Sequence, residues 1–132
     1  MRSEVELRFP PQTFAPTLAR AAVGALGSGL PGSVVKDAEL LTTEVVSNAV
    51  RHAQLTASQE IILRVVVDGY LRVEVMDPGP RFEVDIRKPA AGDRGWGLYL
   101  VDAIARSWGV EPEGPGKKVW FEVGTPLESE PA

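Results

Sequence analysis

The sequence predicts an α+β domain of two layers, in which three helices lie on one face of a mostly antiparallel, mixed sheet. Short segments alternate apolar and charged residues, and longer segments repeat apolar residues at steps of three and four. These segments follow one another as strand, helix, helix, strand, strand, helix, strand. The 132 residues suit one domain, which we assign to 1–125, followed by a disordered acidic tail at 126–132.

Charge and composition exclude several classes of partner and of chemistry. Because the formal charge is −4 and no long basic run is present, we expect neither nucleic acid nor a membrane as a direct partner. The absence of cysteine excludes cysteine chemistry, and one histidine cannot by itself form a zinc site. The N-terminus lacks the apolar core of a signal peptide, and no run approaches the ~20 apolar residues of a membrane helix. We therefore expect a cytoplasmic protein.

The N-terminal part predicts one strand and one helix. Residues Val5–Phe9 alternate apolar and charged side chains, and the prolines that follow end this strand. The segment Pro16–Leu26 predicts a helix because Leu18, Ala22 and Leu26 share a face. The glycines of residues 27–29 end that helix.

A second, longer helix carries the first candidate site residues. Ser33 is its expected N-cap, and its buried stripe is Val35, Ala38, Leu41, Val45 and Ala49. Glu44 and Asn48 lie four residues apart, one turn above the other on the flank of that stripe. Spacing alone leaves two interpretations. Either both side chains are solvated, or they bind a metal ion with its phosphate ligand or a water molecule held for deprotonation.

A hairpin follows at Glu60–Asp77. Asp68-Gly69 between two β-branched runs predicts a tight type I′ turn. Alternation along the second strand places Asp77 on the core side, at the strand end. Asp77 can cap the turn that follows, or it can contact a ligand.

The last third begins with a long connection, residues 78–94, which in a compact domain indicates a functional or mobile segment. Gly95-Trp96-Gly97 then opens a helix with Leu98, Val101, Ile104 and Ala105 on one face, which we expect to stop near Gly109. The two glycines form either a tight turn or an approach for an anion to the helix N-terminus. The final strand is Lys117–Val123.

Each candidate residue has a chemistry of its own. An aspartate at a strand end accepts hydrogen bonds from an exocyclic amine, which would select adenine, and Gly79 lets the backbone lie close to a base. The Asn48 side chain can offer a neutral oxygen to Mg²⁺. Glu44, one turn away, can accept a proton through water.

In order and on these elements, Glu44-x-x-x-Asn48, Asp77-x-Gly79 and Gly95-x-Gly97-Leu98 resemble the N, G1 and G2 boxes of the GHKL (Bergerat-fold) ATPases. More narrowly, the chain is similar to the anti-sigma-factor serine kinases of bacterial partner-switching systems. The likeness includes the run from Asn48 to Ala53 and the closing Val119–Val123, and it extends from the first strand to the last.

The resemblance implies ATP and Mg²⁺ as cofactors and assigns roles within the boxes. Asn48 would hold Mg²⁺ against the triphosphate, Glu44 would activate a partner's serine hydroxyl, and Asp77 would bond the adenine amine beside Gly79. The G2 segment would lie along the phosphates under residues 80–94 as a lid; its nucleotide-binding residues would be Arg94, Gly95, Trp96, Gly97 and Leu98.

The chain departs from the pattern at two places. Pro80 stands where the G1 box often has a second glycine, so the base-side loop is stiffer. Arg94 precedes the G2 glycines and is either a phosphate contact or a solvated lid residue. His52, third in the row of Glu44 and Asn48, is expected to be structural.

Two functions remain open from the resemblance. One is an ATP-dependent protein serine kinase that binds a sigma factor and phosphorylates an anti-anti-sigma (STAS-type) partner. The other is a binding module whose partner choice follows nucleotide occupancy, without phosphate transfer. Sensor histidine kinases share the boxes, but we expect no preceding phosphoacceptor domain in a chain of this length. A homodimer is compatible with either function.

Overall fold

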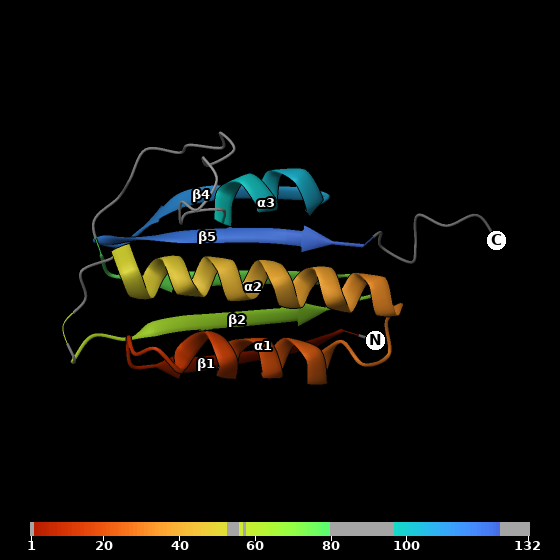
Figure 1. The fold of residues 1–132 in the computed structure, drawn as a ribbon, viewed down its shortest axis with the longest axis horizontal. Coiled ribbons are helices and arrows are strands. Elements are labelled where there is room, and N and C mark those ends of the chain that lie inside the picture. The colour runs from red at the N-terminus through yellow and green to blue at the C-terminus, as the bar shows by residue number, and fades with distance from the viewer. Residues whose placement is uncertain (1, 53–55, 57, 80–96, 125–132) are drawn as a thin grey trace.

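The fold is described by a computed structural model for residues 2–52, 56, 58–79 and 97–124. Five strands form one sheet in the order β1-β2-β3-β5-β4, and every pair is antiparallel. The strands are β1 (Ser3–Phe9), β2 (Ile61–Val67), β3 (Leu71–Asp77), β4 (Ser107–Glu113) and β5 (Gly116–Val123). Three helices cover one face of this sheet (Figure 1). The predicted two-layer α+β class is confirmed, but the described sheet is antiparallel throughout and not mixed.

The first helix, α1 (Ala15–Leu26), turns a different face to the core than the sequence predicts. Ala15, Ala19 and Val23 are fully buried, while Leu18 is 47% exposed. The prediction of Leu18 on the buried face is therefore wrong. The core face carries small side chains, and these allow α1 to lie close against the next helix, with which it makes extensive contact.

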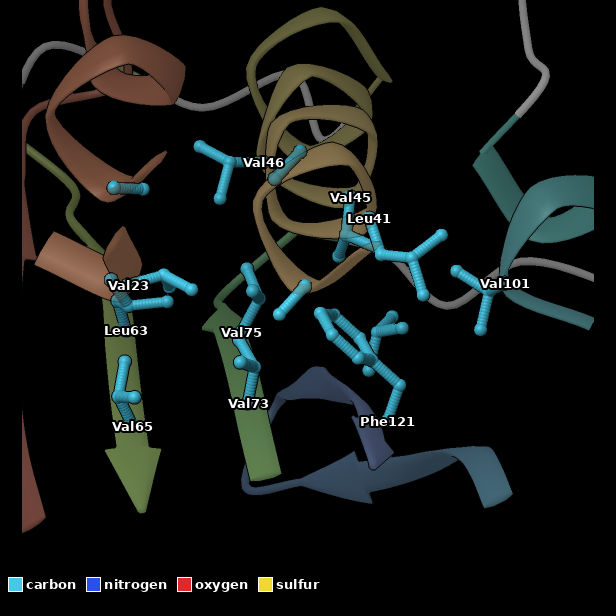
Figure 2. Close-up of a cluster of buried hydrophobic side chains, with 14 of the residues drawn as sticks. Val23, Leu41, Val45, Val46, Leu63, Val65, Val73, Val75, Val101 and Phe121 are labelled. Atoms are coloured by element: carbon cyan, nitrogen blue, oxygen red, sulfur yellow. The ribbon is translucent and has the colours of Figure 1, made fainter. Parts of the chain in front are cut away.

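The central helix, α2 (Gly32–His52), lies between α1 and α3 (Figure 1). It begins one residue before Ser33, so Ser33 lies in the first turn and the N-cap prediction is wrong. The predicted stripe is confirmed for Ala38, Leu41, Val45 and Ala49, all buried. Figure 2 shows Leu41 and Val45 above Phe121 of β5, with Val101 approaching from the third helix. These side chains fix α2 over the middle of the sheet.

The hairpin of β2 and β3 forms where the sequence predicts it, with a longer loop. Val67 pairs with Leu71, so residues 68–70 connect the strands, and Gly69 has a φ of +76°. A two-residue type I′ turn would pair Val67 with Tyr70 instead, so the predicted turn type is wrong. Gly69 still provides the left-handed residue that the loop requires.

The C-terminal part contains a strand that the sequence reading missed. The third helix, α3 (Gly97–Ile104), ends before Gly109, and β4 runs from Ser107 to Glu113 at the sheet edge. Its proline, Pro112, is tolerated because an edge strand has one side without a neighbour. A two-residue turn at residues 114 and 115 joins β4 to β5, and Gly114 there has a φ of +54°.

The face of the sheet away from the helices carries crossed ion pairs. Glu74 accepts hydrogen bonds from Arg64 at 3.2 Å and from Arg72 at 3.0 Å. Burial lowers the pKa of Arg72, but the hydrogen bonds it donates to Glu122 and Glu74 outweigh that effect and raise it. Arg72 also lies 4.3 Å from the ring centre of Trp120. This face is therefore a polar surface, and the apolar core lies on the helix side.

Within the described ranges, no helix has both the length and the apolar character to cross a membrane.

Candidate functional site

Glu44 and Asn48 lie on one flank of α2, as their spacing predicts. Both side chains are half-buried, beside the buried residues Val45 and Ala49 of the same helix. The Asn48 Oδ1 atom accepts a hydrogen bond of 2.9 Å from Nη2 of Arg51, one turn further along. The carboxamide oxygen is thus turned toward the solvent side of the helix, where a cation can reach it.

Asp77 ends β3 with its side chain 3% exposed. Its Oδ1 atom accepts a hydrogen bond of 2.8 Å from the backbone N of Gly79 and another of 2.9 Å from Nζ of Lys117. The bond from Gly79 confirms that Asp77 caps the turn after the strand. No described residue donates a hydrogen bond to Oδ2. The capping function therefore leaves one carboxylate oxygen available as an acceptor.

The first residues of β5 lie directly beside Asp77. Lys117 is the Cα partner of Asp77 in the sheet register, and its side chain is 7% exposed. A Cβ atom on Gly116 would lie 1.9 Å from the Asp77 carbonyl oxygen and 2.6 Å from Cα of Pro78. Only glycine fits at this contact, because both of the opposing atoms belong to the backbone.

The predicted G2 segment is described only from its second glycine onward. Gly97 is the first residue of α3, and Leu98 is 9% exposed and packs in the core with Val101. Leu98 thus anchors the first turn of α3 in the apolar core. Arg94, Gly95, Trp96 and the expected lid, 80–94, lie outside the described residues, as does the predicted tail 126–132. The side chain of His52 is likewise not described.

The fold brings the described candidates to one end of the molecule. In Figure 1 the last turns of α2, the beginning of α3 and the beginning of β5, which pairs with the end of β3, lie at the same end. Helix α2 contacts β3, β5 and α3 directly. Asn48 is in the last turns of α2, Asp77 is at the end of β3, and Gly97 begins α3. Three segments far apart in the sequence thus meet around one region.

These residues fit a purine nucleotide with Mg²⁺. The Asp77 Oδ2 atom matches an exocyclic amine, because a carboxylate oxygen accepts and an amine donates. Among the described residues no group of three or more histidine, cysteine, aspartate or glutamate side chains could hold a metal. Mg²⁺ does not need such a group when water and phosphate supply most of its ligands, so the Asn48 side chain is compatible with a Mg²⁺ site.

Sequence reasoning did not single out Lys117, the residue that pairs with Asp77. Its strand alternates, and Lys117 shares the buried face with Val119, Phe121 and Val123. A lysine on the inward face of a strand is a signal that could have found it, since a buried charge needs a partner. The partner itself follows only from the register, because Asp77 is 40 residues away in the chain.

Comparison with known proteins gives three findings. A family model described as "Histidine kinase-like ATPase domain" matches residues 11–123. An uncharacterised protein of Streptomyces coelicolor is 35% identical over 82 residues, which is 61% of this chain and 78% of that protein. A crystal structure of the RsbU and RsbW domains of a Mycobacterium tuberculosis protein has a similar fold, with a TM-score of 0.70 and 19% identity over 94% of this chain. The chain spans only 33% of that longer chain.

Proposed function

The chain belongs to the histidine kinase-like ATPase family, and on that premise we propose that it is an ATP-binding anti-sigma factor and protein serine kinase. Its substrate is a serine of an anti-anti-sigma (STAS-type) protein, and the phosphorylation state of that protein controls how much sigma factor the kinase holds. The fold shared with a structure that contains an RsbW domain supports this choice within the family.

Each described site residue contacts a different part of the nucleotide. Asp77 accepts a hydrogen bond from the adenine amine, and the start of α3 at Gly97 presents backbone N–H groups toward the phosphates. Asn48 would hold Mg²⁺, which would supply charge neutralisation at the phosphates. Arg51 would have to release the Asn48 oxygen for this, because its Nη2 atom donates a hydrogen bond of 2.9 Å to that oxygen.

One observation carries the kinase proposal beyond ATP binding. Glu44 is half-buried one turn before Asn48, on the same flank of α2. Phosphoryl transfer to a serine requires a group that orients or deprotonates the hydroxyl next to the metal-bound phosphate. A carboxylate in this position performs that step, while a module that only binds nucleotide does not need it.

The test is Glu44→Gln, which keeps the shape of the side chain and removes the base. We expect unchanged Mg-ATP affinity by calorimetry and a loss of about 10²–10⁴-fold in radiolabel transfer from ATP to a STAS-type domain of the same organism. The matched control is Glu39→Gln, because Glu39 is on the same helix but lies against Gly24 of α1. Asn48→Ala should impair the Mg²⁺-dependent part of binding instead.

Two outcomes would change the proposal. If Glu44→Gln transfers phosphate at the wild-type rate, Glu44 is not the base. If the wild type binds ATP and labels no STAS-type domain, the kinase is wrong and the binding module takes its place.

A further inference from the structure

We propose that Lys117 is a positioning residue for the nucleobase: it fixes the Asp77 carboxylate so that Oδ2 faces the exocyclic amine of adenine. This inference rests on the proposed binding of ATP through Asp77. It adds a residue from β5, whose backbone lies directly opposite Asp77 in the sheet.

The hydrogen bonds of Asp77 define the orientation. Lys117 Nζ and the Gly79 backbone N both donate to Oδ1, at 2.9 Å and 2.8 Å. Two donors on one oxygen hold the carboxylate against rotation about its Cβ–Cγ bond, and the second oxygen is left without a described donor. An acceptor fixed in advance loses little freedom when a ligand arrives, which favours affinity and selectivity.

Stability alone is a weak reason for this pair. The two side chains are 7% and 3% exposed, so both charges lose most of their hydration. A buried ion pair often contributes no more than apolar residues of the same volume. The rest of the Lys117 face is Val119, Phe121 and Val123, where apolar packing prevails. A charged contact between Lys117 and Asp77 in such a layer, at the residue that would meet the base, points to recognition.

The arrangement depends on close backbone contact. Gly116 lies against the carbonyl of Asp77, and this contact brings the first residues of β5 next to the end of β3. The Lys117 side chain therefore reaches Asp77 from a fixed strand rather than from a loop. Gly116 and Lys117 directly follow the turn that joins β4 to β5, so both lie at the candidate site.

The experiment compares two nucleotides that differ only at the exocyclic amine, ATP and purine riboside triphosphate. Calorimetry gives the affinity of each for the wild type and for Lys117→Met, which keeps the length of the side chain. We expect the wild type to prefer ATP by roughly tenfold to a hundredfold, the effect of one charged hydrogen bond. In Lys117→Met the preference should fall to about threefold or less, because the carboxylate is free to turn. A general structural loss would weaken both nucleotides equally and leave their ratio unchanged.

Two variants serve as controls. Lys117→Arg keeps a cation opposite Asp77 and should restore most of the preference. Lys118→Met changes the neighbouring lysine on the other face of β5, which lies 4.0 Å from Glu111, and should leave the preference unchanged. If Lys117→Met does not fold in buffer, the titrations are made in concentrated sucrose, which favours the compact state.

The outcomes separate this inference from the proposed function. A folded Lys117→Met protein that keeps the wild-type preference overturns the positioning role of Lys117 and leaves ATP binding intact. A wild type that binds neither nucleotide, or does not distinguish them, overturns the assignment of Asp77 and with it the basis of the proposed function.

Discussion

At the scale of single residues, the proposed function makes Asp77 a link between the stability of the sheet and the recognition of the base. Its Oδ1 atom caps the turn at Gly79 and holds Lys117, while Oδ2 is left for a ligand. A substitution here is therefore expected to affect folding and binding at the same time. The two effects are separable because they depend on different oxygens.

The first prediction is that Asp77→Asn weakens ATP binding roughly tenfold to a hundredfold, because an uncharged amide replaces the charged acceptor. It should also lower the free energy of unfolding by about 1.5–3 kcal/mol, because the buried charged hydrogen bond from Lys117 to Asp77 is lost. Calorimetry and urea unfolding measure the two effects on the same protein. Asp68→Asn, in the exposed hairpin loop, is the control and should change neither value. An unchanged ATP affinity in a folded Asp77→Asn protein would remove Asp77 from the site.

At the scale of elements, the beginning of β5 is as important to the candidate site as α2. Gly116 contacts the backbone of Asp77 and Pro78 so closely that no side chain fits between them. The beginning of β5 therefore sets the distance between the ends of β3 and β5. Through that distance it sets the Asp77–Lys117 pair.

The second prediction follows from this contact. Gly116→Ala should lower the free energy of unfolding by at least about 1–3 kcal/mol, since the two strand ends must separate to admit the methyl group. ATP affinity should fall as well, because the separation moves Lys117 away from Asp77. Gly29→Ala is the control, since a Cβ there would meet nothing within 4 Å. Wild-type stability in Gly116→Ala would show that the backbone adjusts without loss of the contact.

The sequence predicts elements well where one periodicity dominates. The strands β1, β2, β3 and β5 and the long stripe of α2 were all expected from alternation or from steps of three and four. Strand β4 was missed because Gly109, Pro112 and Gly114 interrupt its pattern, so the helix was extended over its beginning. The face of α1 was misassigned because large and small apolar residues have similar periodicity, and only packing against α2 selects the small ones.

The candidate site was likewise predictable from the sequence only in part. Helical spacing places Glu44 and Asn48 on the same flank of α2, and strand alternation turns Asp77 toward the core. Both placements follow from the local sequence. The pairing of Asp77 with Lys117 depends on sheet register between strands that are not consecutive, β3 and β5. No local pattern contains that information. The hydrogen bond from Arg51 to Asn48 was likewise not foreseen, because a side-chain rotamer selects it.

At the scale of the whole molecule, the site joins both layers. Asn48 and Glu44 belong to the helix layer and Asp77 and Lys117 to the sheet, and the core that holds the layers together is centred on Leu41, Val45 and Phe121 (Figure 2). A ligand that contacts both layers adds contacts across this core. Its binding free energy must then appear as stability of the entire domain.

The last prediction concerns that linkage. At a free Mg-ATP concentration about 100 times its Kd, the free energy of unfolding should rise by about 2.7 kcal/mol, which for a domain of this size raises Tm by roughly 10 °C. ATP with a chelator should give a smaller shift, because the metal that we propose Asn48 to hold is then absent. In Asn48→Ala the shifts with and without Mg²⁺ should become equal, while in Asp77→Asn both should shrink. Thermal unfolding followed by circular dichroism measures all of these without any assay of phosphate transfer. A wild-type shift that is the same with and without Mg²⁺ would exclude Asn48 as a metal ligand, since a ligand that does not engage the metal cannot couple it to folding.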